Sequence, residues 1–265
     1  MTSPPPLCEF RSVCKWYGPV IGLNDVSLRI DAGITGLVGH NGAGKSTLIK
    51  LLTGQLRPSL GSVRIRGHRA WSSAAKRHIG YCPDLDAMYE EMSGRAFVEA
   101  LARLHGYSRR EARERTDCQL ARVGMADRAT RPLRTYSKGM RQRIKLAQAL
   151  VHDPDLVVLD EPLNGVDPVG RTELLQLFRG LADQGKAVLV SSHILDEMDT
   201  LADQIVFVCR GRLIASGSLA EIRAMLDRFP LKIRVTAPDA RRLAHALLPL
   251  ELVRSCLLYT SDAAD

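Results

Sequence analysis

A glycine-rich segment at residues 39–47, Gly-His-Asn-Gly-Ala-Gly-Lys-Ser-Thr, has the residue types and spacing of a phosphate-binding loop. It follows the short apolar run at residues 35–38 and precedes a helical pattern at residues 46–53. Glycines let the backbone curl until several N–H groups point at one anion, and the N-terminus of the next helix adds partial positive charge. We expect the Lys45 ammonium to bind the β- and γ-phosphates of a nucleotide and the Ser46 hydroxyl to bind Mg²⁺.

Two carboxylates follow an apolar strand expected at residues 155–160. The run Leu-Val-Val-Leu-Asp-Glu-Pro carries them as Asp160 and Glu161. A strand end beside a phosphate-binding loop is where nucleotide hydrolases hold Mg²⁺, so we expect Asp160 to bind the metal through water. Glu161 would face the γ-phosphate and orient or deprotonate the attacking water. Alone, the pair is equally well an acidic turn, but the loop in the same chain favours catalysis.

His193 closes another strand predicted at residues 186–191. A histidine in that position is often structural. In the company of Glu161 it becomes a candidate for contacting the γ-phosphate and the attacking water.

A further anion site is possible at residues 136–142, Tyr-Ser-Lys-Gly-Met-Arg-Gln, which open a predicted helix. Ser137 and Gly139 lie at its N-terminus, where free backbone N–H groups favour negative charge. By itself this segment is simply a helix cap.

Composition restricts the class of protein. The 265 residues are 45% hydrophobic, which is enough for one large or two modest domains. Although the net charge is +8, the one dense arginine cluster, at residues 109–115, is interleaved with glutamates and predicts a solvated helix face. Aromatic residues are only 5%, which does not favour stacking on bases, so no nucleic-acid partner is expected. Neither a signal peptide nor an apolar run long enough to cross a bilayer is recognised.

Strands and helices alternate through the middle of the chain, a pattern typical of a parallel sheet covered on both faces. In a helix predicted at residues 93–105, Phe97, Leu101, Leu104 and His105 are expected to share the packed face. Further elements are predicted as strands at residues 8–13, 26–30 and 63–66, a helix capped by Ser108 and Glu111, a helix starting at Pro168, a hairpin at residues 205–216 and a helix from Ser218 to about Arg228.

Taken together, these motifs resemble the ATP-binding cassette of ABC transporters over about residues 8–228. GHNGAGKS looks like the Walker A motif, YSKGM like the signature motif and LVVLDEP like the Walker B motif. Residues 164–167 look like the D-loop, His193 like the switch histidine, and Tyr17 like the aromatic residue that stacks on adenine. Six matches in the family's order are highly specific.

The resemblance implies an α/β fold of the P-loop NTPase class: a mixed, largely parallel sheet core with an N-terminal antiparallel β subdomain and an α-helical subdomain at about residues 85–150. The cassette is assigned to residues 7–228. The implied ATP-binding residues are Tyr17, Gly39, Asn41, Gly42, Gly44, Lys45, Ser46, Thr47, Ser137 and Gly139. The implied catalytic residues are Glu161, His193 and Lys45, and the implied Mg²⁺ ligands are Ser46, Asp84 and Asp160.

Two departures from the family pattern stand out. Lys138 and Met140 replace a glycine and the glutamine of the usual LSGGQ signature, and Lys138 is expected to add charge near a partner's phosphates. Aspartate stands at position 84, where the family has the Q-loop glutamine. Asp84 can still bind Mg²⁺ or its water, but its shorter side chain changes its reach.

In the family, ATP lies between the Walker A of one subunit and the signature of the other. The resemblance therefore implies an ATP-hydrolysing subunit that forms a head-to-tail homodimer, or a dimer with a related ABC subunit, around two ATP. It also implies an integral-membrane permease subunit as partner and a peripheral location on the cytoplasmic face of the cell membrane. The YSKGM form and the single cassette are similar to ATPase subunits of ABC-2 type exporters.

Two other classes remain open at this stage. A soluble ABC ATPase acting on DNA or ribosomes is an alternative, although no sustained heptad repeat and no second cassette is recognised. A metabolic P-loop kinase would need neither Ser137 with Gly139 nor His193.

A separate unit is predicted to start after Pro230, with a strand at residues 231–237 and a helix from Asp239. Residues 229–255 are interpreted as the start of a small, truncated C-terminal accessory unit. The last ten residues, CLLYTSDAAD, resemble the translation of a sequencing adapter, so residues 256–265 are expected to be an artefact and are excluded from fold reasoning.

Overall fold

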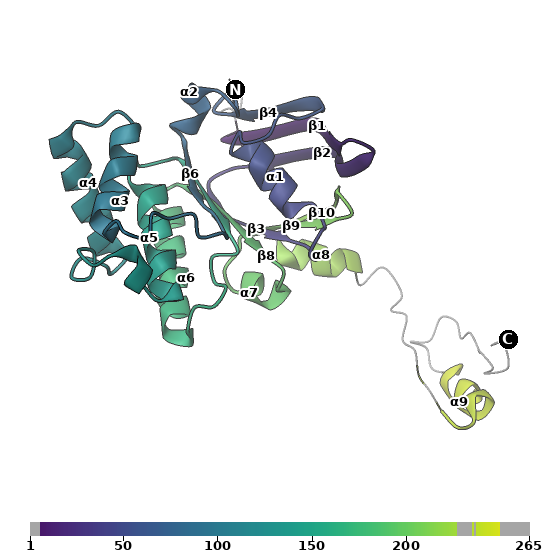
Figure 1. The fold of residues 1–265 in the computed structure, drawn as a ribbon. Coiled ribbons are helices and arrows are strands. Elements are labelled where there is room, and N and C mark those ends of the chain that lie inside the picture. Colours follow the sequence, from purple (N-terminus) through teal and green to yellow (C-terminus); the bar gives the residue numbers. More distant parts are fainter. Residues whose placement is uncertain (1–5, 227–234, 236, 250–265) are drawn as a thin grey trace. The chain divides into compact units, whose positions relative to one another are not determined.

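The computed structural model describes residues 6–226, 235 and 237–249 (Figure 1). The chain divides into two compact units, Met1–Leu219 and Ala220–Asp265. The first unit contains all the predicted site residues.

An antiparallel sheet forms the N-terminal part of the first unit, with strand order β2-β1-β4-β5. Its strands are β1 (Cys8–Tyr17), β2 (Val20–Ile30), β4 (Leu60–Ile65) and β5 (His68–Arg69). β1 and β2 are longer than predicted because irregularities break the alternation of buried and exposed residues. The pairing of β1 with β2 shifts register between Phe10 and Val13, and Ser12 there has a φ of 42°.

A second, six-stranded sheet has the order β10-β9-β3-β8-β7-β6. Its strands are β3 (Gly33–Val38), β6 (Ile79–Cys82), β7 (Leu156–Asp160), β8 (Ala187–Ser192), β9 (Gln204–Cys209) and β10 (Arg212–Gly217). All neighbours are parallel except the β9–β10 hairpin. The fold class predicted from the sequence is thereby confirmed. In register, Val38 pairs with Ser192 and Asp160 with Ser191, so the carboxyl ends of β3, β7 and β8 share one edge.

Helix α1 (Lys45–Leu52) connects the two sheets. Its buried residues Leu48, Ile49 and Leu52 belong to one hydrophobic core that also contains residues of both sheets, such as Val63 and Leu189. The phosphate-binding loop at the start of α1 is therefore anchored on both sides by packed apolar side chains.

Three helices, α3 (Gly94–Leu104), α4 (Arg109–Arg122) and α5 (Lys138–Leu150), contact one another, and α5 also contacts β6 (Figure 1). Ser108 and Glu111 form the predicted capping box of α4. The remaining helical segments of the first unit are α2 (Ser73–Lys76), the 3₁₀ turn η1 (Leu133–Thr135), α6 (Pro168–Asp183), which Asp167 caps, and α7 (Leu195–Asp199).

The packed face predicted for α3 is partly wrong. Leu104 is 82% exposed, and the buried residues are Gly94, Phe97, Val98 and Ala102. One of them is a glycine because a neighbour comes very close: a Cβ on Gly94 would lie 2.6 Å from the Tyr136 Oη atom. The prediction relied on large side chains, so it included Phe97 correctly but overlooked Gly94 and Ala102 and included the exposed Leu104 and His105.

In the C-terminal part, α8 (Leu219–Leu226) and α9 (Ala240–Leu247) are helical. Asp239 caps α9 by accepting a hydrogen bond from the Arg242 N–H, in agreement with the predicted helix start. The strand predicted at residues 231–237 falls mostly, and the segment at residues 256–265 entirely, outside the described residues. Within the described part of the chain, no helix is both long and apolar enough to cross a bilayer.

Gly80 in β6 tests the packing of α5 against the sheet. A Cβ at this position would lie 2.1 Å from the Ala149 carbonyl oxygen, so Gly80→Ala must displace backbone. We expect it to lower the free energy of unfolding by about 1–3 kcal/mol. Gly180→Ala in α6 is the control: its Cβ meets no atom within 4 Å, and helix propensity predicts a gain of about 0.5–1 kcal/mol. Urea denaturation measures both; equal effects would contradict the packing.

Candidate functional site

The phosphate-binding loop lies between β3 and α1, as predicted. Gly42 and Gly44 have φ values of 79° and 114°, which favour glycine. A Cβ on Gly39 would lie 2.3 Å from the Val208 carbonyl oxygen, so that position also requires glycine. The Lys45 ammonium is buried beneath the loop and donates a hydrogen bond of 2.5 Å to the Gly39 carbonyl oxygen. The loop is thus already curled around its lysine.

The acidic pair lies at the same sheet edge, held by Ser191. The Ser191 hydroxyl donates to Asp160 Oδ1 at 2.7 Å and accepts from the Glu161 N–H at 2.9 Å. Glu161 has a φ of 48°, a conformation that non-glycine residues rarely adopt, and the bond to Ser191 holds it there. Ser191 is buried. Its role was not predicted, because a serine inside an apolar strand gives no local signal of its partners.

Glu161 connects the loop to the predicted switch histidine. One of its carboxylate oxygens lies 3.6 Å from Lys45 Nζ, and the other lies 3.0 Å from His193 Nδ1. The side chains of Lys45 and Glu161 are 8% and 14% exposed, whereas that of His193 is 41% exposed. A cation, a carboxylate and an imidazole therefore meet at the end of three parallel strands, as the sequence predicted.

The electrostatics of Asp160 differ from those of a surface carboxylate. Burial raises the pKa of its carboxyl, and the charges of Asp84 and Glu161 raise it further, although the Ser191 hydrogen bond and the Lys45 charge lower it. A cation bound here would offset both the free-energy cost of burying the Asp160 charge and its repulsion from Asp84 and Glu161. Ser191 bonds to Oδ1, which leaves Oδ2 as the oxygen available to a cation or to its water.

The donor set fits a hard cation. Ser46 is exposed at the start of α1, and the carboxylate of Asp160 and the nearby Asp84 supply oxygen atoms, which Mg²⁺ prefers. No cluster of three or more His, Cys, Asp or Glu among the described residues is arranged to hold a metal ion without other ligands. Mg²⁺ in proteins commonly uses one or two carboxylates and takes other ligands from phosphates and water.

Tyr17, the predicted adenine-stacking residue, lies beside the start of α1. Its hydroxyl is 3.4 Å from the Thr47 hydroxyl, and its ring is half exposed at the tip of the β1–β2 hairpin. Gly22 lies against the ring, since a Cβ there would come within 2.7 Å of it. Tyr17 and Thr47 thus share one surface next to the loop.

The signature residues lie at the start of α5 and not at the sheet edge that carries Lys45, Glu161 and His193. Ser137 caps α5 by accepting a hydrogen bond from the Met140 N–H, and Gly139 has open space where a Cβ would be. The Lys138 side chain lies against Gly165 of the predicted D-loop, where a Cβ would come within 2.6 Å of Lys138 Nζ. Lys138 therefore contacts its own D-loop, a contact that sequence spacing does not predict.

Strand β6 and the segment after it, which contains Asp84, are both bound to α5. Gln148 Nε2 donates to the Tyr81 carbonyl oxygen at 2.6 Å, and Arg141 forms a two-bonded ion pair with Glu90 at 2.6 and 2.7 Å. These contacts, too, were not predicted. They tie the predicted Q-loop region to the helix that carries the signature motif.

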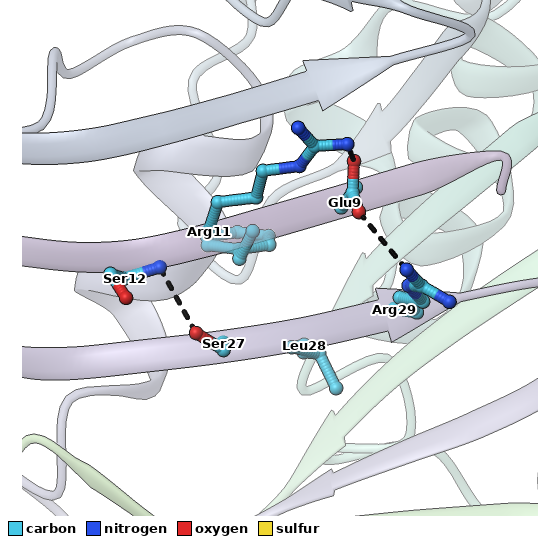
Figure 2. A pocket seen from close by; sticks show the side chains of 7 residues that line it. Glu9, Arg11, Ser12, Ser27, Leu28 and Arg29 are labelled. Carbon is cyan, nitrogen blue, oxygen red and sulfur yellow. Dashed lines mark hydrogen bonds and ion pairs between the residues drawn. The ribbon is translucent and has the colours of Figure 1, made fainter. Parts of the chain in front are cut away.

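Cavities elsewhere do not coincide with this site. One of about 380 Å³ lies on the antiparallel sheet, lined by residues of β1 and β2 (Figure 2). In it, the Glu9 carboxylate is paired with Arg11 at 2.7 Å and Arg29 at 3.5 Å, and these contacts hold the pKa of Glu9 below its usual range. Because the charges pair with one another across the sheet, the cluster is explained by the fold alone.

Comparison with known proteins agrees with this geometry. The family model described as ABC transporter matches residues 23–164, more than half of the chain. The daunorubicin/doxorubicin resistance ATP-binding protein DrrA of Streptomyces peucetius is 37% identical over 254 residues, covering 95% of this chain and 77% of that protein. This chain belongs to the ABC transporter family.

Solved structures support the same assignment for the fold of this ABC ATPase. An ATP-binding subunit of an ABC transporter superposes with a TM-score of 0.77 at 30% identity, over 83% of this chain and 93% of that one. A dimeric bacterial ABC transporter cassette superposes with a TM-score of 0.74 at 22% identity, over 80% and 98%. The chain is the ATP-binding, ATP-hydrolysing subunit of an ABC transporter.

The raised pKa of Asp160 leads to a prediction about stability. A group whose pKa is higher in the folded than in the unfolded state makes stability fall as pH rises through the folded-state value. Without nucleotide, Asp160→Asn should therefore melt above the unsubstituted ATPase at pH 7.5, and the difference should shrink towards pH 4, near the ordinary pKa of an aspartate. Scanning calorimetry measures this, with Asp183→Asn at the exposed end of α6 as control. A lower melting temperature for Asp160→Asn at both pH values would contradict it.

Proposed function

We propose that two copies of this ABC ATPase close around two ATP molecules, each held between the phosphate-binding loop of one subunit and the signature motif of the other. The observation that supports this most is that the two groups belong to different elements and have different hydrogen-bond and ion-pair partners within one chain. Lys45, Glu161 and His193 are joined at the sheet edge, whereas Ser137 begins a helix of the α3–α5 group. The dimeric state of a structurally similar cassette is consistent with this arrangement.

The nucleotide contacts follow from the geometry of the loop. The backbone N–H groups from Gly39 to Thr47 and the N-terminus of α1 bind the phosphates, with Lys45 as counter-charge. Tyr17 stacks on adenine, and in trans the exposed Ser137 and the half-buried Gly139 at the start of α5 bind the γ-phosphate. The loop residues concerned are Gly39, Asn41, Gly42, Gly44, Lys45, Ser46 and Thr47.

Ser46, Asp160 and Asp84 are the residues that would hold Mg²⁺, whose charge offsets that of the phosphate oxygens. Glu161 acts as the general base. In this role, the Glu161 carboxylate, which His193 contacts, would accept the proton of the attacking water. His193 fixes the carboxylate and contacts the γ-phosphate. Before ATP binds, Glu161 is also paired with Lys45, so nucleotide binding must draw Lys45 away before the base is free.

The ATPase powers export through a separate integral-membrane permease subunit, and it lies peripherally at the cytoplasmic face of the cell membrane. The drug-resistance function in the name of the DrrA relative favours export. Leu85 and Tyr89, which follow Asp84, are 79% and 72% exposed, and a hydrophobic permease segment is a suitable partner for them.

We also assign residues 7–228 to the cassette, with the helical subdomain at about 85–150, and residues 229–255 to an accessory unit.

Glu161→Gln tests the general base. It should bind ATP but hydrolyse it about 10² to 10⁴ times more slowly, because the water loses its proton acceptor. It should also accumulate as an ATP-bound dimer, visible as an earlier elution in size exclusion when Mg·ATP is present. Asp183→Asn, at the exposed end of α6, is the control and should turn over normally. Near-normal turnover of Glu161→Gln would remove Glu161 from this role.

Lys45→Ala tests the phosphate site. Loss of the buried ammonium should abolish tight ATP binding in isothermal titration calorimetry, since the triphosphate loses its main counter-charge. Lys50→Ala is the matched control, because Lys50 lies in the same helix but is exposed. If Lys45→Ala bound ATP as tightly as Lys50→Ala, the phosphate-binding assignment would be wrong.

A further inference from the structure

One face of α5 carries polar side chains that bind β6 and successive parts of the segment that follows it. Arg141, Lys145 and Gln148 are spaced at i, i+4 and i+7, so they share a face of the helix. Arg141 binds Glu90, and Gln148 binds the backbone of Tyr81. Lys145 lies between them, and it contacts the part of the segment that contains Asp84.

Lys145 is unusual because its charge is buried. The residue is 6% exposed, and its ammonium lies 2.9 Å from Asp86 Oδ1 and 3.0 Å from the Asp84 carbonyl oxygen. Removing a lysine charge from water is unfavourable unless partners replace the lost hydration. Both partners come from the same short loop. The ion pair therefore restricts that loop to one arrangement relative to α5.

That arrangement matters for the carboxylate of Asp84. Asp84 is exposed and close enough to Asp160 for its charge to act on that carboxyl. An aspartate side chain is one methylene shorter than the glutamine that the resemblance predicts at this position, so the backbone must be held correctly for its carboxylate to reach a shared cation. The Lys145 ammonium binds the backbone carbonyl of Asp84 itself.

We propose that Lys145 is a positioning residue of the nucleotide site, which holds the Asp84–Asp86 loop so that the Asp84 carboxylate lies beside Asp160 where Mg²⁺ binds. This inference rests on the proposed function. A purely structural role for Lys145 makes a different prediction: its removal would weaken the fold, and nucleotide binding with and without Mg²⁺ would change together.

The test compares ATP binding in EDTA with binding in excess Mg²⁺, by isothermal titration calorimetry in a Glu161→Gln background that prevents hydrolysis. The Glu161→Gln protein without a second substitution should bind ATP more tightly with Mg²⁺ than in EDTA. Lys145→Met keeps the apolar stem and Asp86→Asn keeps the size of the side chain. Both, like Asp84→Asn, should reduce that gain about 10-fold while leaving the affinity in EDTA unchanged. Lys186→Met, which removes a lysine paired with Asp153 elsewhere, should retain the full gain.

A full Mg²⁺ gain in folded Lys145→Met and Asp86→Asn would overturn the inference, as would an equal loss of affinity with and without Mg²⁺. If Lys145→Met does not fold, Asp86→Asn decides, because the Asp86 side chain is 37% exposed and its replacement leaves the core intact. Failure of the Glu161→Gln protein itself to bind ATP would instead contradict the proposed function. The two failures are therefore distinguishable.

Discussion

The ion pair between Lys45 and Glu161 is the interaction on which the rest of the site depends. It joins the phosphate-binding loop after β3 to the carboxylate after β7, with both side chains almost buried. A triphosphate carries more negative charge than one carboxylate and can be bound by the loop N–H groups as well, so it competes for Lys45. Glu161 already contacts His193 through its other oxygen. In the proposed mechanism, nucleotide binding therefore frees the Glu161 oxygen that is paired with Lys45, and ATP takes the place of that contact.

The positions of Lys45, Glu161 and His193 are set by the packing of the buried strands and not by the phosphate-binding loop alone. β3, β7 and β8 are buried and in register, so their carboxyl ends form one edge. Helix α5 then connects two parts of the machinery: Ser137 begins it, and its Lys145 and Arg141 hold the segment that contains Asp84. These contacts connect that segment directly to the helix that carries the signature motif. Under the proposed function, they would link a membrane partner to a nucleotide bound by the other subunit.

Much of this arrangement could be predicted because it is encoded locally. A glycine loop between a strand and a helix, two carboxylates ending an apolar strand and a serine-capped helix are each recognisable within a few residues, and the sheet edge brings Lys45, Glu161 and His193 together as expected. The contacts of Ser191, Lys138 and Lys145 were not predictable, because each depends on a partner distant in sequence. The packed face of α3 was missed for another reason: Gly94 and Ala102 pack closely without being strongly hydrophobic.

An experimental structure of Glu161→Gln with Mg·ATP tests the central claim most directly. The account predicts a dimer in which the γ-phosphate of each ATP contacts Lys45 of one subunit and lies within hydrogen-bond distance of the signature serine and the Gly139 N–H of the other. A structure in which each ATP is enclosed by a single chain, with the start of α5 from the second copy far from the phosphates, would contradict it.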